Sequence, residues 1–333
     1  MTLPRVRPKN EFPYAGTREM ARRRRNTDME FRTLAENLQF PEGPVAMADG
    51  SVVLVEIAAG CLTRVTPNGT KVIVARPGGG PNGAAVGPDG KGYVANNGGF
   101  SWHRENGRIR PLLQAEDYSG GRLERIDLAS GAVEVLYREC GGHALRGPND
   151  LVIDKSGGVY FTDLGKRRAR DMDVGGVYYA KPDGSSIVEV AYPLVTPNGI
   201  GLSPDETELY VAETEAARLW AFPIEAPGVV KKEPWPVPHG GRIVAGMGGY
   251  QRFDSLAVQA DGRIAVATLV NGGITVISPD GRHVEHHPFP DPMTTNICFG
   301  GPDMKTAFIT LSWTGRLVAV DWPTPGLKLN QAG

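Results

Sequence analysis

Hydrophobic and polar positions follow a pattern that repeats six times along the chain. In each copy, a residue with a side-chain oxygen precedes a short apolar run, a turn follows seven residues later, and a run rich in β-forming residues comes next. Three of these turns contain Asp-Gly, which is a strong hairpin signal between apolar runs, so each copy predicts an antiparallel strand pair. The six copies are PEGPVAMADGSVVLVEI (41–57), PNGAAVGPDGKGYVANN (81–97), PNDLVIDKSGGVYFTDL (148–164), PNGIGLSPDETELYVAET (197–214), FDSLAVQADGRIAVATL (253–269) and TNICFGGPDMKTAFITL (295–311).

A second pair of alternating strands follows most copies. Examples are CLTRVTPNGTKVIVA (61–75), RLERIDLASGAVEVL (122–136), GVYYAKPDGSSIVEV (176–190) and GITVISPDGRHVEHH (273–287). Four strands repeated six times, with a period of about 51 residues, predict an all-β, six-bladed β-propeller with four antiparallel strands per blade. No segment has the pattern of a long helix.

The repeats place the propeller at residues 29–325, between an N-terminal extension (1–28) and a C-terminal tail (326–333). The last copy lacks an outer strand, and residues 29–37 are predicted to supply it, so that an N-terminal strand closes the ring and leaves no sheet edge free. The extension contains the run Arg22–Arg25. It is interpreted as a surface extension or a strap, with a nuclear-localisation or polyanion-binding segment as the alternative.

Composition and charge narrow the function classes. The 333 residues include 36 Lys+Arg and 37 Asp+Glu, and the net charge of -1 favours neither a nucleic-acid nor an anionic-membrane partner. Three scattered cysteines exclude a disulfide framework and a Cys-rich zinc site. No apolar stretch is long enough to span a bilayer and no signal-peptide core is present, so a cytoplasmic location is expected. Nothing in the sequence sets the oligomeric state.

The second residue of each copy, an amide or a carboxylate in every case, is a candidate site residue. These residues are Glu42, Asn82, Asn149, Asn198, Asp254 and Asn296. Each enters an innermost strand, so all six are expected near one end of the central channel. An oxygen-only set with two carboxylates suits Ca²⁺, Mg²⁺ or Mn²⁺ better than Zn²⁺. As an alternative, Asn and Asp at such positions bind local backbone N–H groups, which accounts equally well for Asn82 and Asn198.

Four of these segments carry a family resemblance. PEGP (41–44), PNDLVIDKSGGVYFTD (148–163), TPNGIGLSPDETELYVAET (196–214) and FDSLAVQADGRIAVA (253–267) resemble the senescence marker protein, gluconolactonase and luciferin-regenerating enzyme family. The resemblance covers roughly residues 38–322. It implies a six-bladed propeller with one catalytic divalent metal in the channel and hydrolysis of sugar lactones.

The resemblance also assigns roles by position. It implies that Glu42, Asn198 and Asp254 are metal ligands, that Asp254 is the general base, and that Asn149 binds substrate or completes the metal shell. Sugar-lactonase members carry an arginine two residues before that asparagine. Here that position is Gly147, and Arg146 stands one residue further away.

These observations together predict metal-dependent hydrolysis of a small-molecule lactone, with the metal polarising the carbonyl and Asp254 orienting or deprotonating water. Ca²⁺ is the expected ion, with Mg²⁺, Mn²⁺, Fe²⁺ and Zn²⁺ as alternatives. Two other functions remain open: phosphotriester hydrolysis at the same site, and a non-catalytic calcium-binding propeller. No G-x-S-x-G, Walker A or dinucleotide motif supports a serine hydrolase, an ATPase or a dehydrogenase.

Two long loops are expected on the metal face and are candidates for specificity or a lid, at 97–120 and 164–174. Further substrate-binding candidates are Asn82, Asn149, Arg146, Trp102, His143 and Tyr250, with His103, Arg167 and Phe253 beside them. A second polar set follows the first by 14 or 15 residues and is expected to support the metal, to form a second ion site, or to be solvated strand ends. Its members are Glu56, Asn96, Asp163 and Glu213.

Overall fold

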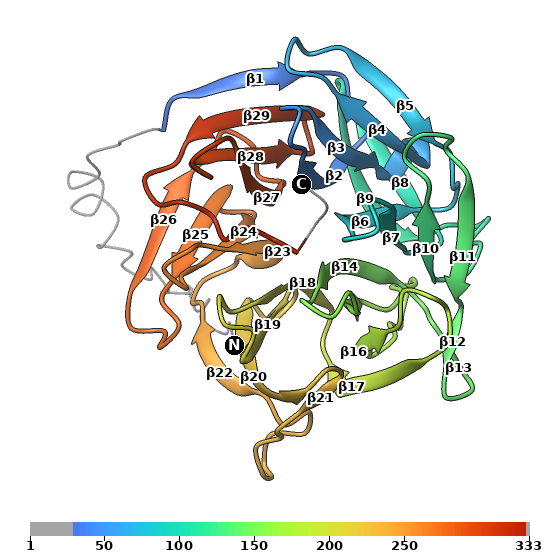
Figure 1. Cartoon of the computed structure of the whole chain (residues 1–333), viewed down its shortest axis with the longest axis vertical. Helices are drawn as coiled ribbons and strands as arrows, with labels where there is room; N and C mark the ends of the chain where they lie inside the picture. Colours follow the sequence, from blue (N-terminus) through green and yellow to red (C-terminus); the bar gives the residue numbers. More distant parts are fainter. Residues whose placement is uncertain (1–28, 331–333) are drawn as a thin grey trace, which may run out of the picture.

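Six antiparallel sheets surround a central channel and form a six-bladed β-propeller, which confirms the predicted fold (Figure 1). The computed structural model describes residues 29–330, so the Arg22–Arg25 run and the rest of the predicted extension lie outside the described residues. Within residues 29–330 the only helical element is a single 3-10 turn, η2 (Ile57–Ala59). No helix in this part of the chain is long and apolar enough to cross a membrane.

Each blade has four strands that run from the channel outward. Blade 1 has β2 (Pro41–Ala46), β3 (Val52–Glu56), β4 (Cys61–Val65) and β5 (Lys71–Ala75). Blade 2 has β6 (Pro81–Val86), β7 (Gly92–Asn96), β10 (Arg122–Ile126) and β11 (Val133–Tyr137). Blade 3 has β14 (Pro148–Ile153), β15 (Val159–Asp163), β16 (Gly175–Ala180) and β17 (Ile187–Leu194).

Blades 4 to 6 have the same order. Blade 4 has β18 (Pro197–Leu202), β19 (Glu208–Glu213), β20 (Arg218–Ala226) and β22 (Arg242–Gly246). Blade 5 has β23 (Arg252–Val258), β24 (Ile264–Leu269), β25 (Gly273–Ile277) and β26 (Val284–Pro288). Blade 6 has β27 (Thr294–Gly300), β28 (Thr306–Leu311), β29 (Arg316–Asp321) and β1 (Phe31–Ala35). The remaining strands are β21 (Val229–Val230), which also pairs with β20, and the hairpins β8 (Phe100–Glu105) with β9 (Arg108–Gln114) and β12 (Glu139–Cys140) with β13 (His143–Ala144).

The ring closes as predicted from residues 29–37. Strand β1 pairs antiparallel with β29, with Phe31 opposite Val320 and Ala35 opposite Leu317. Met29 and Phe31 pack against the apolar cluster between blades 5 and 6, and Ala35 is buried in the cluster between blades 6 and 1. The last blade therefore has no free outer edge at β29, which removes a site for edge-to-edge aggregation.

The hydrophobic core lies between neighbouring sheets. One cluster joins blade 3 to blade 4 through Tyr160, Tyr179, Val211 and Phe222, and comparable clusters fill the other gaps. The innermost strands approach one another too closely for most side chains. A Cβ atom on Gly83 would lie 2.5 Å from the Asn149 carbonyl oxygen, and one on Gly199 would lie 2.6 Å from that of Asp254. The glycine in each Pro-Asn-Gly segment therefore follows from the close approach of the next blade.

Every innermost strand is irregular beside its candidate site residue. The pairing with the second strand shifts register at Glu42/Val45, Pro81/Gly83, Pro148/Leu151, Pro197/Ile200, Phe253/Leu256 and Thr294/Asn296. A β-bulge bends the strand and re-aims its side chains. A bulge beside each candidate site residue thus influences the direction of its side chain at one end of the channel.

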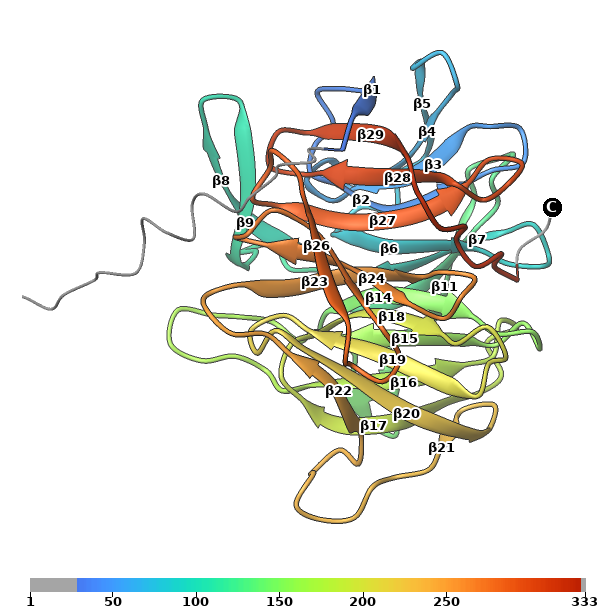
Figure 2. The same cartoon turned by 90° about the vertical axis from the view of Figure 1, so that its left-hand side faces the viewer.

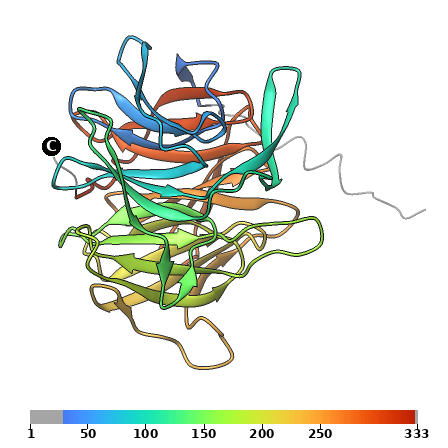
Figure 3. The same ribbon diagram turned by 90° about the vertical axis from the view of Figure 1, so that its right-hand side faces the viewer.

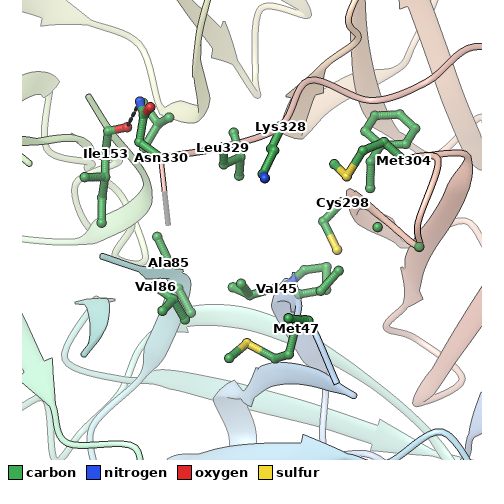
Figure 4. Close-up of a pocket in the computed structure, with 18 of the residues that line it drawn as sticks. Val45, Met47, Ala85, Val86, Ile153, Cys298, Met304, Lys328, Leu329 and Asn330 are labelled. Carbon is green, nitrogen blue, oxygen red and sulfur yellow. Dashed lines mark hydrogen bonds between the residues drawn. The ribbon is translucent and has the colours of Figure 1, made fainter. Parts of the chain in front are cut away.

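The two ends of the channel differ. The β8–β9 hairpin projects from one face, and the last described residues cross the opposite face (Figures 2 and 3). There, Gly326 N donates to Met304 O (2.8 Å), Leu327 N to Val258 O (2.9 Å) and Asn330 Nδ2 to Ile153 O (3.1 Å). This segment covers an apolar pocket of about 280 Å³, shown with Leu329 and Lys328 above it in Figure 4.

Candidate functional site

A pocket of about 230 Å³ lies at the end of the channel that carries the β8–β9 hairpin. Five of the six polar residues predicted from the repeat line it, and each is less than a tenth exposed. They are Glu42, Asn82, Asn149, Asn198 and Asp254. The structure therefore brings together the four residues to which the family resemblance assigns metal-binding roles.

The sixth polar residue, Asn296, binds Glu42 instead of lining this pocket. Its Nδ2 donates to Glu42 Oε2 (2.7 Å), and the backbone N–H of Gly43 donates to the same oxygen (2.7 Å). Both hydrogen bonds fix the orientation of the Glu42 carboxylate and engage only one of its oxygens. Asn296 is therefore a supporting residue for Glu42.

The Asn198 amide is also oriented by its neighbours. Its Nδ2 donates to Thr214 Oγ1 (3.1 Å), and Ser255 Oγ donates to its Oδ1 (3.4 Å). Because the nitrogen donates to the threonine and the amide oxygen has two lone pairs, of which Ser255 uses one, the oxygen can still bind a cation or a substrate.

Three buried carboxyl groups interact at the centre of the propeller. Burial raises the pKa of Glu42 to about 7 and that of Asp150 to about 8, where repulsion from Glu42 adds to the effect. The pKa of Asp254 lies well above its ordinary range because of burial and of repulsion from Glu42, and a hydrogen bond with Asn198 opposes the shift. None of the three forms an ion pair with a Lys, Arg or His of residues 29–330.

The donor set fits a hard divalent cation. Carboxylate and amide oxygens are the ligands that Ca²⁺, Mg²⁺ and Mn²⁺ prefer, and two carboxylates without a cationic partner match the charge of one such ion. No cluster of three or more His, Cys, Asp or Glu side chains suited to a metal occurs in the described part of the chain. The candidate site thus depends on amide oxygens as well as on carboxylates.

Asp150 is a buried acidic residue that sequence reasoning did not select. It follows Asn149 directly, at the position that is Gly43, Gly83 and Gly199 in three other blades. It accepts a hydrogen bond from Leu151 N (2.9 Å). The aspartate in PND (148–150), where three other blades have glycine, is the sequence feature that could have identified this residue.

Lys166 is a second residue that the sequence did not reveal. Its side chain lines the pocket yet is almost fully buried, and its Nζ donates to Asn97 Oδ1 and to Gly99 O, each at 2.9 Å. The ammonium nitrogen lies 3.9 Å from the centroid of the Phe100 ring. Burial lowers the pKa of Lys166 to about 7. This lysine ties the loop before β16 to the loop before β8.

Both long loops predicted for the metal face contribute to the pocket. The β8–β9 region supplies Phe100 and Arg110–Leu113, and the loop after β15 supplies Leu164, Lys166, Arg167, Met172 and Asp173. Of the loop candidates named from the sequence, Arg167 lines the pocket, whereas Trp102 and His103 do not. Trp102 instead packs on Phe40, with ring centroids 5.3 Å apart.

Several predicted substrate-binding residues lie outside the pocket. Arg146 and His143 are exposed on the segment before β14, and the Arg146 carbonyl accepts a hydrogen bond from Tyr118 Oη (2.6 Å). Tyr250 is 73% exposed and lies against Arg252, and Phe253 is fully buried in the core between blades 4 and 5. Of the six main substrate-binding candidates, only Asn82 and Asn149 line the pocket, and of the three residues named beside them only Arg167 does.

The second polar set anchors the loops that lead into the innermost strands. Glu56 accepts from Gln39 N, Asn96 from Gly80 N, Asp163 from Arg146 N and Gly147 N, and Glu213 from Val195 N, at 2.6–2.9 Å. All four are buried, so their oxygens satisfy backbone donors rather than solvent. The repeat at 14 or 15 residues therefore reflects one structural contact made in four blades, and not solvated strand ends.

Replacing Asp163 by Ala should destabilise the fold by about 2–5 kcal/mol, because three backbone N–H groups, those of Arg146, Gly147 and Gly165, lose a buried acceptor. Urea unfolding followed by tryptophan fluorescence measures the change. Asp183→Ala in the exposed turn of the same blade is the matched control and should have a much smaller effect. Equal effects of the two substitutions would contradict the anchoring role.

Comparison with known proteins places this arrangement in a family. Residues 40–312 match the SMP-30/Gluconolactonase/LRE-like region. This chain belongs to that family. The match covers most of the chain and confirms the resemblance seen in the four sequence segments.

Two curated proteins and a solved structure are similar to this chain. A gluconolactonase of Zymomonas mobilis is 28% identical over 313 residues, which span 84% of this chain and 78% of that protein. Lactonase drp35 of Staphylococcus aureus is 35% identical over 133 residues, which span 40% of this chain and 39% of that protein. The crystal structure of regucalcin, a calcium-binding protein from Agrobacterium tumefaciens, superposes with a TM-score of 0.72 at 20% identity, covers 92% of this chain and 98% of that one, and shares the fold.

Proposed function

We propose that this member of the SMP-30/gluconolactonase/LRE-like family hydrolyses a lactone with a divalent metal ion held by Glu42, Asn149, Asn198 and Asp254. The observation that carries the proposal is the group of oriented oxygen ligands at the base of a small pocket, including two buried carboxylates without a cationic partner. The names of the gluconolactonase and lactonase relatives support the reaction class.

When bound, the ion would polarise the lactone carbonyl and favour attack by water. Asp254 accepts a proton from the attacking water as the new C–O bond forms at the carbonyl carbon. The ring C–O bond then breaks, and the ring oxygen leaves and takes up a proton, which Asp254 returns. Water and lactone thereby give one hydroxy acid, and Asp254 ends the cycle in its initial state.

The other lining residues position the substrate. Asn82 and Asn149 present side-chain amides to the pocket and are placed to hydrogen-bond substrate oxygens. Phe100, Leu112 and Met172 give the mouth an apolar wall, which favours a compact ring and excludes water from the reacting centre. A volume of about 230 Å³ is below the roughly 300–1,000 Å³ of drug-sized pockets, so a small lactone suits it.

The proposal predicts that removing the metal abolishes turnover. Acid release from sugar, aliphatic and aromatic lactones should fall to the spontaneous rate after chelation and should return on addition of Ca²⁺, Mg²⁺ or Mn²⁺. Turnover that survives complete chelation would contradict the metal's role. A metal-loaded protein that cleaves only a phosphotriester such as paraoxon would support phosphotriester hydrolysis instead. A metal-loaded protein that cleaves neither class of substrate would support the non-catalytic calcium-binding propeller.

A further inference from the structure

The lining of the pocket contains charged side chains of both signs. Four cationic side chains line the pocket, from the β8–β9 hairpin, the loop after β15 and the start of β23. They are Arg110, Lys166, Arg167 and Arg252. Four acidic residues also line it, namely Glu42, Asp173, Glu215 and Asp254. The partners of these acids decide the net charge that a substrate meets.

Most of the acidic charge is already matched by other groups. Asp173 Oδ1 pairs with Arg168 Nη2 (2.8 Å), and Asp173 also accepts from the backbone of Lys166 (3.1 Å). Under the proposed function, Glu42 and Asp254 bind a divalent cation. Glu215 is then the single acid among the lining residues left to balance the three arginines, and Lys166, whose pKa burial lowers to about 7, adds a partial positive charge.

Two arginines share that carboxylate. Arg252 Nη2 lies 3.0 Å from Glu215 Oε2, and Arg167 Nη1 lies 3.4 Å from Glu215 Oε1. Lys166 binds only uncharged oxygens, and Arg110 forms no ion pair with any carboxylate of residues 29–330. The pocket therefore has an excess of positive charge, and its two paired arginines already bind a carboxylate from two directions.

Arg252 is the best placed of these residues to select a substrate. It stands two residues before Asp254 and is only 28% exposed at its side chain. Its Nε is buried and has no hydrogen-bond partner, and its guanidinium lies 5.5 Å from the Tyr250 ring centroid. The guanidinium pairs with Glu215 through Nη2, and such a planar, partly exposed group can bind a second carboxylate beside the first.

We propose that the substrate of this enzyme is an anionic lactone, which carries a free carboxylate that Arg252 and Arg167 bind at the mouth of the pocket. This inference rests on the lactonase function proposed above. Glu215 holds the two arginines side by side in the absence of substrate. The substrate class is the monolactone of a sugar dicarboxylic acid, in which the ring enters the pocket and the carboxylate remains at its rim.

A matched pair of lactones tests the inference. D-glucaro-1,4-lactone carries a carboxylate where D-glucono-1,4-lactone carries a hydroxymethyl group, and the rings are otherwise the same. With the metal-loaded protein, kcat/KM should be about 10- to 100-fold higher for the carboxylated lactone, which is the range expected for a charge-assisted hydrogen-bonded pair. Added salt should reduce this preference, because the arginines are partly exposed.

Substitutions test whether Arg252 causes the preference for the carboxylated lactone. Arg252→Met should lower kcat/KM for the carboxylated lactone about 10-fold or more beyond its effect on the neutral lactone, and Arg252→Lys should restore part of the preference. Arg242→Met is the control, since Arg242 lies in the outer strand β22, pairs with Glu208 and does not line the pocket. Calorimetric titration with D-glucarate and D-gluconate gives a second readout without catalysis, and the tighter binding of glucarate should disappear in Arg252→Met.

The outcomes separate the two proposals. Equal or better turnover of the neutral lactone by the wild type, or an equal loss on both lactones in Arg252→Met, would overturn the anionic-substrate inference while metal-dependent lactone hydrolysis stands. Absence of metal-dependent turnover of both lactones would overturn the lactonase function, and the inference with it.

Discussion

Asp254→Asn should lower kcat for lactone hydrolysis by about 10²- to 10⁴-fold at saturating metal, the range that a general base contributes. The amide keeps the shape of the side chain and an oxygen that can contact the ion, but it cannot accept the proton of the attacking water. Initial rates of acid release, with metal content measured on the same samples, give the comparison.

The control for this prediction is Asp261→Asn, the same substitution in the same blade. Asp261 lies in the turn between β23 and β24, seven positions further along the chain, where it binds Arg263 at 2.8 Å. Its replacement should leave kcat unchanged. If Asp254→Asn retains both its metal and the wild-type kcat, Asp254 is not the base.

Glu42→Gln should weaken metal binding by at least about 100-fold, because it removes one of the two carboxylates of the ligand set, and even outer-shell substitutions cost about 10- to 100-fold. At saturating metal most of kcat should return, since Glu42 does not transfer a proton. Electron paramagnetic resonance of free Mn²⁺ during titration of chelator-treated protein measures the affinity.

Glu36→Gln is the matched control for the metal measurement. Glu36 is exposed between β1 and β2 and does not line the pocket. An unchanged Mn²⁺ affinity in Glu42→Gln, together with an unchanged affinity in Glu36→Gln, would exclude Glu42 as a ligand. The Glu42 and Asp254 variants together separate ion binding from proton transfer.

The fold was predictable because the repeat is visible at the level of single residues. The turn seven positions after each polar residue and the bulge beside it recur in all six blades, and closure by residues 29–37 followed from the missing outer strand. The convergence of Glu42, Asn149, Asn198 and Asp254 followed from the same repeat, since equivalent positions of a propeller surround one axis.

Residues outside the repeat were harder to predict. Lys166 and Arg110 lie in loops whose path depends on contacts with distant segments, such as the hydrogen bonds of Lys166 to Asn97 and Gly99. Arg146, His143 and Tyr250 were chosen because they are close in sequence to Asn149 or Asp254, and Trp102 because it lies in a long loop. The chain directs them to the surface or to other aromatic side chains.

The repeat itself also concealed different roles at equivalent positions. Asn296 occupies the same repeat position as Asn198, yet it donates to Glu42 instead of facing the pocket. Its strand shifts register one residue earlier, between Thr294 and Asn296, which turns the side chain toward the neighbouring carboxylate. A local difference in bulge geometry of this kind has no signature in a single sequence.

The central claim is that Glu42, Asn149, Asn198 and Asp254 hold one divalent ion at the base of the pocket. The most direct test is an anomalous-difference map from crystals of the protein soaked in Mn²⁺. The account predicts one strong peak within coordination distance, about 2.0–2.6 Å, of oxygen atoms from these four side chains. No peak there, in crystals of a protein that binds Mn²⁺ stoichiometrically in solution, would contradict it.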